Sequence, residues 1–125
     1  MGKKGEQMEK KLKICGQEYD AKASFLTQVK YYEQFGKDFA EAIANINDRL
    51  VSLSKEKESI NYIRVFGAIS IDATRLAYVM IKEANPTFME YEEWIGQLDG
   101  LYDETEWISE VVKLGFSVFR RTLSQ

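Results

Sequence analysis

A long apolar segment in the middle of the chain limits the folds that the chain can adopt. The segment INYIRVFGAISIDATRLAYVMIKEA runs from Ile60 to about Ala84 and is apolar almost throughout. A helix that is apolar around so much of its circumference is typical of the central helix of a bundle. We expect its inward face to carry Ile63, Phe66, Ser70, Ala73, Ala77 and Met80, broadened by Ile69, Leu76 and Ile81.

The ends and continuity of this central helix depend on a glycine and a proline. Gly67 and the β-branched residues could kink the helix or divide it in two. Pro86 ends it, because the residue before a proline disfavours helical backbone. The segment 54–59, SKEKES, is a polar connection on its N-terminal side.

Two further helices are predicted before the central one. The first spans residues 24–35, with Ser24 as its N-cap and Gly36 at its end. Its expected inward stripe is Phe25, Val29 and Tyr32, extended by Leu26. The second spans residues 38–53, where apolar residues recur at three- and four-residue steps: Phe39, Ile43, Ile46, Leu50 and Leu53.

Two more helices are predicted after the central one. Thr87 and Glu90 form a capping-box pattern that begins a helix through Leu98. The last helix spans about 103–123, with one stripe formed by Ile108, Val111, Val112, Gly115, Phe116, Phe119 and Leu123. Trp107, Leu114 and Val118 extend beyond that stripe.

Residues 11–22, KLKICGQEYDAK, alternate between apolar and polar residues around a glycine and predict a β-hairpin. We expect a two-residue Gly16–Gln17 loop in a type II′ turn. That register pairs Ile14 with Tyr19 and Leu12 with Ala21, and it places all four on one face. A two-stranded ribbon is marginally stable alone, so this face should pack on the helices.

These elements predict a mainly α (α+β) fold: a bundle of about five helices with one N-terminal hairpin. The 125 residues suit a single domain. We expect a flexible tail over residues 1–10 and one domain over residues 11–125. The tail lacks the apolar core of a secretory signal, and no apolar run is long enough for a membrane span.

The residue inventory argues against catalysis. Histidine is absent, which removes the commonest general base and transition-metal ligand. The single cysteine, Cys15, excludes the usual zinc and iron–sulfur spacings. A carboxylate site is conceivable at seven acidic residues, but they are better explained as solvated helix starts: Glu90, Glu92, Glu93, Asp99, Asp103, Glu104 and Glu106. We therefore expect no enzyme activity, metal or cofactor.

The net charge of −3, with scattered basic residues, also makes nucleic acid a poor candidate partner.

Three sequence pieces carry a family resemblance: LKICGQEYDAKASF with Gly16 and Tyr19 at the hairpin, ANPTFMEYEEWI, and the terminal VVKLGFSVFRR. Their order resembles that of the tail assembly chaperones of long-tailed bacteriophages, especially those of Gram-positive hosts. Cys15 is a departure, since family members often have asparagine before the hairpin glycine.

The resemblance implies a nonenzymatic assembly factor in the cytoplasm of an infected bacterium. Such a protein would coat the tape-measure protein, help to recruit tail-tube subunits, and be absent from the mature virion. A coat around a long client also implies a homo-oligomer.

A helix-binding chaperone needs accessible apolar side chains, and adjacent or off-stripe residues are the candidates: Tyr31, Tyr32, Trp107, Leu114 and Val118. The alternative interpretation is that they complete one broad core. Two other functions stay open: a bacterial helical adaptor or oligomerisation module unrelated to phage tails, and a small carboxylate-dependent enzyme.

Overall fold

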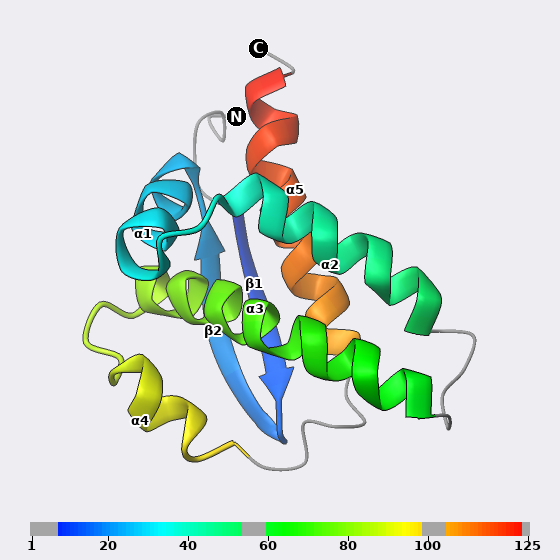
Figure 1. Ribbon diagram of the computed structural model, residues 1–125. Coiled ribbons are helices and arrows are strands. Elements are labelled where there is room, and N and C mark those ends of the chain that lie inside the picture. The colour runs from blue at the N-terminus through cyan, green and yellow to red at the C-terminus, as the bar shows by residue number, and fades with distance from the viewer. Residues whose placement is uncertain (1–7, 54–59, 99–104, 124–125) are drawn as a thin grey trace.

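The computed structural model describes residues 8–53, 60–98 and 105–123. Within these ranges it contains two strands and five helices in the order β1 (Met8–Ile14), β2 (Gln17–Ala23), α1 (Phe25–Phe35), α2 (Phe39–Leu53), α3 (Ile60–Ala84), α4 (Tyr91–Ile95) and α5 (Glu106–Leu123). Figure 1 shows the antiparallel hairpin packed against the helices. The predicted mainly α fold with one N-terminal hairpin is confirmed.

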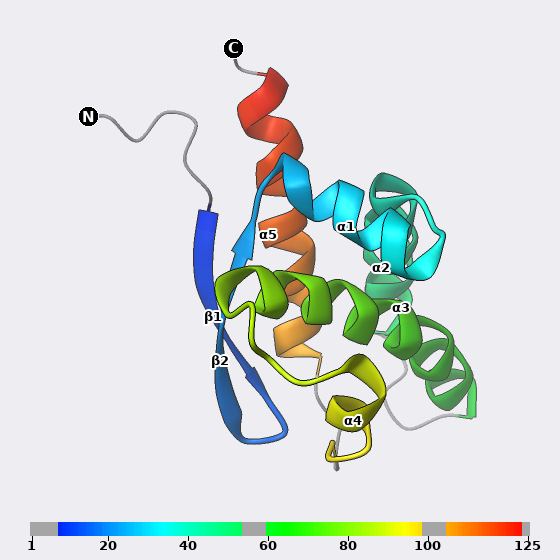
Figure 2. The same cartoon turned by 90° about the vertical axis from the view of Figure 1, so that its left-hand side faces the viewer.

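The hairpin forms one layer and the helices cover a single face of it. Helix α3 packs against β2, and α5 packs against β1 and β2. Helices α1 and α2 pack along α3, on the same side of the hairpin as the other helices, as Figure 2 shows. The hairpin therefore closes one side of a helical core.

Helix α3 is the central helix, as its composition predicts. It runs without interruption from Ile60 to Ala84, so Gly67 neither ends nor divides it. It contacts β2 and all four other helices. Its buried residues are Tyr62, Phe66, Ile69, Ala73, Thr74, Leu76, Ala77, Tyr78, Val79, Met80 and Ile81. Ile63, expected on the inward face, is 49% exposed.

The hairpin is longer than expected and its predicted turn is wrong. The strands extend over 8–23, so residues 8–10 belong to β1 and not to a tail, while residues 1–7 lie outside the described ranges. The loop is Cys15–Gly16, with φ of 53° and 81°. Positive φ at both central residues is the pattern of a type I′ turn, whose twist matches that of the ribbon.

The strand register differs accordingly from the prediction. Ile14 lies opposite Gln17 and Leu12 opposite Tyr19. This register is two residues away from the expected Ile14–Tyr19 pairing, and a shift of two leaves every side chain on its original face. The predicted inner face is therefore correct: Leu12, Ile14 and Ala21 are buried, and Tyr19 is half-buried.

Charges on the outer face of the hairpin explain why this register is preferred. Its three directly opposed pairs all join opposite charges: Glu9 with Lys22, Lys11 with Asp20, and Lys13 with Glu18. The Lys11 Nζ atom lies 2.7 Å from Asp20 Oδ1, and this hydrogen bond raises the pKa of Lys11. The expected register would have set Lys11 against Lys22, and like charges directly opposite are destabilising.

Replacing Cys15 with asparagine is expected to stabilise the protein by about 1 kcal/mol, since asparagine adopts positive φ more readily than other non-glycine residues. Urea unfolding of the wild type and Cys15→Asn, followed by circular dichroism, measures the gain. Cys15→Ala is the matched control, because it removes the thiol without relieving the backbone. Equal stability of the two variants would contradict a strained turn.

Helix α1 presents the opposite face to the one predicted. Its expected inward residues are the exposed ones, with Phe25 at 67% and Tyr32 at 64%. The buried residues of α1 are Thr27 and Tyr31. A hydrogen bond that the Thr27 hydroxyl donates to Glu83 of α3, described below, holds this polar side chain inward, so the apolar stripe faces solvent.

The last two helices begin later than predicted. The Thr87 hydroxyl donates to the Asn85 side chain, and α4 begins after Glu90, so the expected capping box is not formed. Helix α5 begins at Glu106. Residues 99–104, which include the predicted start at 103, lie outside the described ranges.

Candidate binding surface

The exposed apolar face of α1 is formed by Phe25, Leu26, Val29 and Tyr32. Their side chains are 67%, 48%, 39% and 64% exposed, respectively. Residues three and four apart are neighbours on a helix surface, so these four form one continuous patch about two turns long. Large apolar side chains gathered on one face mark an interaction surface more often than scattered single ones do.

A groove lies beside this patch, between α1 and the end of α3. It has a volume of about 510 Å³, and its lining includes Leu26, Lys30, Glu33, Val79, Lys82 and Pro86. Val79 is 3% exposed. The Lys82 amino group donates to the Phe88 carbonyl at 2.8 Å, which fixes this side chain at the groove. Charges of both signs lie among the lining residues.

A carboxylate from α3 sets the orientation of α1. The Ser24 hydroxyl donates to one oxygen of Glu83, and the Thr27 hydroxyl donates to the other, both at 2.6 Å. The Ser24 backbone N–H in turn donates to the Thr27 hydroxyl oxygen at 2.8 Å. Hydrogen bonds to an ionised group are shorter and stronger than neutral ones. This arrangement locks the first turn of α1 with Thr27 inward and the apolar stripe outward.

The five predicted binding residues differ in exposure: one is accessible and four are buried. Tyr32 is accessible on α1, as described above. The other four are buried, with exposed fractions of 0% for Tyr31, 2% for Trp107, 3% for Leu114 and 2% for Val118. The prediction that these four offer an accessible surface is therefore wrong, and they complete the core instead.

Two different environments explain why these residues are buried. Helix α5 packs against the hairpin on one side and α2 on another, so its buried arc is wider than one stripe. Trp107, Leu114 and Val118 fall within that arc. Tyr31 contacts the rings of Phe35 and Phe39, with centroids 5.5 Å and 5.9 Å away.

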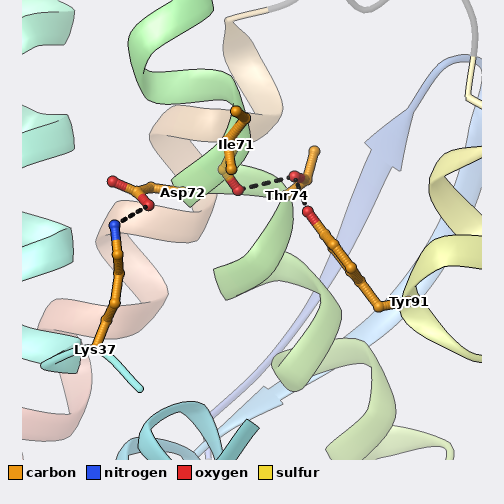
Figure 3. A network of polar contacts seen from close by, with 5 residues as sticks. All are labelled: Lys37, Ile71, Asp72, Thr74 and Tyr91. Carbon is orange, nitrogen blue, oxygen red and sulfur yellow. Dashed lines mark hydrogen bonds and ion pairs between the residues drawn. The ribbon is translucent and has the colours of Figure 1, made fainter. Parts of the chain in front are cut away.

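Polar contacts of α3 with Lys37 and Tyr91 connect neighbouring segments and stabilise the fold. Figure 3 shows the Thr74 hydroxyl, which donates to the Ile71 carbonyl at 2.9 Å and lies 2.9 Å from the Tyr91 hydroxyl. Lys37 and Asp72 form an ion pair at 3.4 Å. Burial, and to a smaller extent the Asp72 charge, raises the pKa of Tyr31. Tyr31 is fully buried and is a core residue.

The described residues offer no metal centre and no membrane helix. No group of three or more cysteine, aspartate or glutamate residues in the described ranges could hold a metal ion. Glu90, Glu92, Glu93 and Glu106 are exposed near the starts of α4 and α5, whereas Asp99, Asp103 and Glu104 lie outside the described ranges. The described part of the chain has no helix with the length and apolarity needed to cross a membrane.

Sequence reasoning missed the groove and the orientation of α1. The available signal was weak: Ser24 and Thr27 are polar residues in a first turn, and Glu83 lies 56 residues beyond Thr27.

Comparisons with family models, curated proteins and solved structures gave no match for this chain. The resemblance to tail assembly chaperones therefore stays an expectation.

Proposed function

We propose that this chain is a nonenzymatic binding protein that holds an apolar helical segment of a client against α1. The observation that carries the proposal is the exposed patch Phe25, Leu26, Val29 and Tyr32. An amphipathic helix can bind by placing its apolar face against a hydrophobic groove or patch, and its contacting side chains recur at three- and four-residue steps like the apolar residues of α1. The groove between α1 and α3 provides room beside the patch.

In the specific form of the proposal, the chain is a phage tail assembly chaperone. Its client is the tape-measure protein, whose long helical segments it keeps soluble in the host cytoplasm. It then helps to recruit tail-tube subunits and leaves before the virion is complete. The hairpin–helix order and the exposed apolar patch both support this assignment, and no step of it requires a catalytic residue.

Co-expression with a candidate tape-measure protein tests the proposal. The wild-type chain should increase the soluble share of the client, and the Phe25→Ser/Tyr32→Ser double variant should return it to the level without chaperone. Both positions are largely exposed, so the variant should fold normally. Val51→Ser is the matched control, because Val51 is 58% exposed on α2 and outside the patch. A client that precipitates equally with and without the wild-type chain would refute the chaperone function.

The same patch also supports a second candidate, a helical adaptor unrelated to phage. An adaptor would form a stable small complex with one compact partner and would have no affinity for tail proteins. Co-purification with a tail protein and dependence on Phe25 and Tyr32 would together exclude the adaptor.

A further inference from the structure

The outer edge of β1 carries main-chain groups that have no partner in the sheet. The sheet has two strands, so β1 pairs with β2 along one edge only. The residues that flank a two-residue loop form a hydrogen-bonded pair, which here is Ile14 with Gln17. Such pairs alternate along the ribbon, so the N–H and C=O groups of Lys11 and Lys13 point away from β2. Among the described residues, no backbone–backbone hydrogen bond outside the hairpin ladder involves Lys11 or Lys13.

A groove of about 710 Å³ lies along this edge, between β1 and the first turns of α5. Figure 1 shows β1 between β2 and α5. No lining residue of the groove belongs to β2, and its walls include Lys10, Lys11 and Lys13 from β1 and Glu106, Trp107 and Glu110 from α5. Lys11 and Lys13 lie on the outer face of the hairpin, whereas Lys10 lies on the inner face. A groove lined from both faces of one strand follows the edge of that strand.

The lysines of β1 differ in how far their charge is compensated within the chain. Lys10 is paired with Glu110 at 2.7 Å, so these two lining charges compensate each other. Lys11 is paired with Asp20 on the outer face, where it stays exposed. Lys13 is exposed and takes part in none of the ion pairs within 4 Å among the described residues. The edge therefore presents positive charge at alternate positions beside unpaired main-chain groups.

We propose that the outer edge of β1 binds an extended acidic peptide segment of a partner protein, which adds to the hairpin as an antiparallel strand. In strand addition, main-chain hydrogen bonds supply affinity and alternate side chains supply specificity. Peptide residues opposite Lys11 and Lys13 place their side chains on the outer face, where opposite charges on opposed residues are stabilising. The peptide residue between them lies on the inner face, toward α5. Glu106 on that wall disfavours a third carboxylate, so the expected pattern is acidic, uncharged, acidic.

The length of the edge limits the peptide. Lys10 to Lys13 cover about 10 Å of strand, so the groove holds about four residues of extended chain. A contact of this size predicts weak, reversible binding. It lies on β1 and α5, outside the apolar patch of α1, so this inference does not depend on the proposed client binding.

Lysines on an exposed edge also have a protective role, because charged side chains there discourage pairing with other chains. The two roles predict different results. A purely protective edge rejects acidic and basic peptides alike, whereas a binding edge accepts the acidic peptide and rejects the basic one.

Fluorescence anisotropy of a labelled peptide, titrated with the full chain, tests the proposal. The probe is fluorescein-Thr-Thr-Glu-Val-Glu-Thr-Thr-amide, and its counterpart has lysine in place of both glutamates. We expect saturable binding of the acidic probe with a Kd of about 100 µM or below, and at least about tenfold weaker binding of the counterpart. No saturation up to about 1 mM protein, or equal binding of the two peptides, would overturn the proposal.

N-methylation at alternate positions of the probe tests the main-chain pairing. In the antiparallel strand the glutamates direct their N–H groups toward β1, whereas the valine directs its N–H group away. N-methylation of the second glutamate should therefore abolish binding, and N-methylation of the valine should have a much smaller effect. Equal affinities of the two methylated probes would contradict strand addition.

Lys13→Gln should weaken binding of the acidic probe about threefold, because it removes one cross-strand charge pair. Lys13 is exposed, so the variant should fold normally, which circular dichroism checks. Arg64→Gln is the matched control, since Arg64 is exposed on α3 and lines neither this groove nor the one beside α1. A Lys13→Gln variant that binds the probe as tightly as Arg64→Gln does would contradict recognition by charge.

Discussion

Replacing Trp94 with alanine is expected to lower the free energy of unfolding by about 3–5 kcal/mol, a large part of the stability of a single domain. Trp94 is fully buried and anchors the short helix α4. Its ring packs with those of Tyr19 on the hairpin, Tyr78 on α3 and Phe88 before α4, with centroids 5.9, 6.0 and 5.9 Å away. The substitution leaves a cavity where three elements meet.

Urea unfolding followed by far-ultraviolet circular dichroism measures this loss without relying on the removed chromophore. Tyr32→Ala is the matched control, because it removes an aromatic ring that is 64% exposed and should change stability by less than about 0.5 kcal/mol. Trp94→Phe should recover a large part of the lost stability. A loss below about 1 kcal/mol for Trp94→Ala would mean that α4 is not anchored through this ring.

Replacing Gly115 with leucine is expected to destabilise the protein by about 3 kcal/mol through overpacking. A Cβ atom at this position would overlap the Ile43 Cδ1 atom and lie 3.1 Å from Cγ1, with the Phe39 ring at 3.6 Å. Ile43 and Phe39 are each 1% exposed, so neither side chain can move out to solvent without loss of burial. Urea unfolding measures the change.

A double-mutant cycle identifies the cause. Ile43→Val removes the Cδ1 atom that would overlap, so Gly115→Ala should cost much less stability in that background than in the wild type. Residues in direct contact typically show such coupling at about 0.5–3 kcal/mol. Gly67→Ala is the matched helical control and should stabilise the monomer, because no other helix or strand among the described residues has an atom within 4 Å of its added Cβ. Additive effects of Gly115→Ala and Ile43→Val would contradict a steric origin.

The sequence predicted the elements that depend on local pattern. Helix α3 was predictable because its residues are apolar nearly all round and Pro86 follows it. The inner face of the hairpin was predictable because Leu12, Ile14, Tyr19 and Ala21 share a face in either candidate register. The register itself was not predicted correctly, although the opposite charges at Lys11 and Asp20 carried the signal.

The direction in which α1 faces was beyond the local pattern. Phe25, Val29 and Tyr32 do form a genuine apolar stripe, but periodicity does not reveal whether the chain covers its own stripe or leaves it exposed. The deciding residue is Glu83, which is far from α1 in sequence. The same limit explains the wrong prediction for the binding residues. Periodicity gives one inward stripe for α5, so residues beside that stripe, such as Trp107, were expected to be accessible. The hairpin and α2 cover two sides of α5 and bury them.

The clamp formed by Glu83 has a consequence for when the proposed binding site exists. Ser24 and Thr27 are oriented by a carboxylate that a ribosome adds only after α1, α2 and nearly all of α3 have been synthesised. A nascent chain that does not yet include Glu83 therefore lacks the hydrogen bonds that hold the apolar residues of α1 outward. The patch that we propose for client binding is therefore held in its final orientation only after the last turn of α3 has formed.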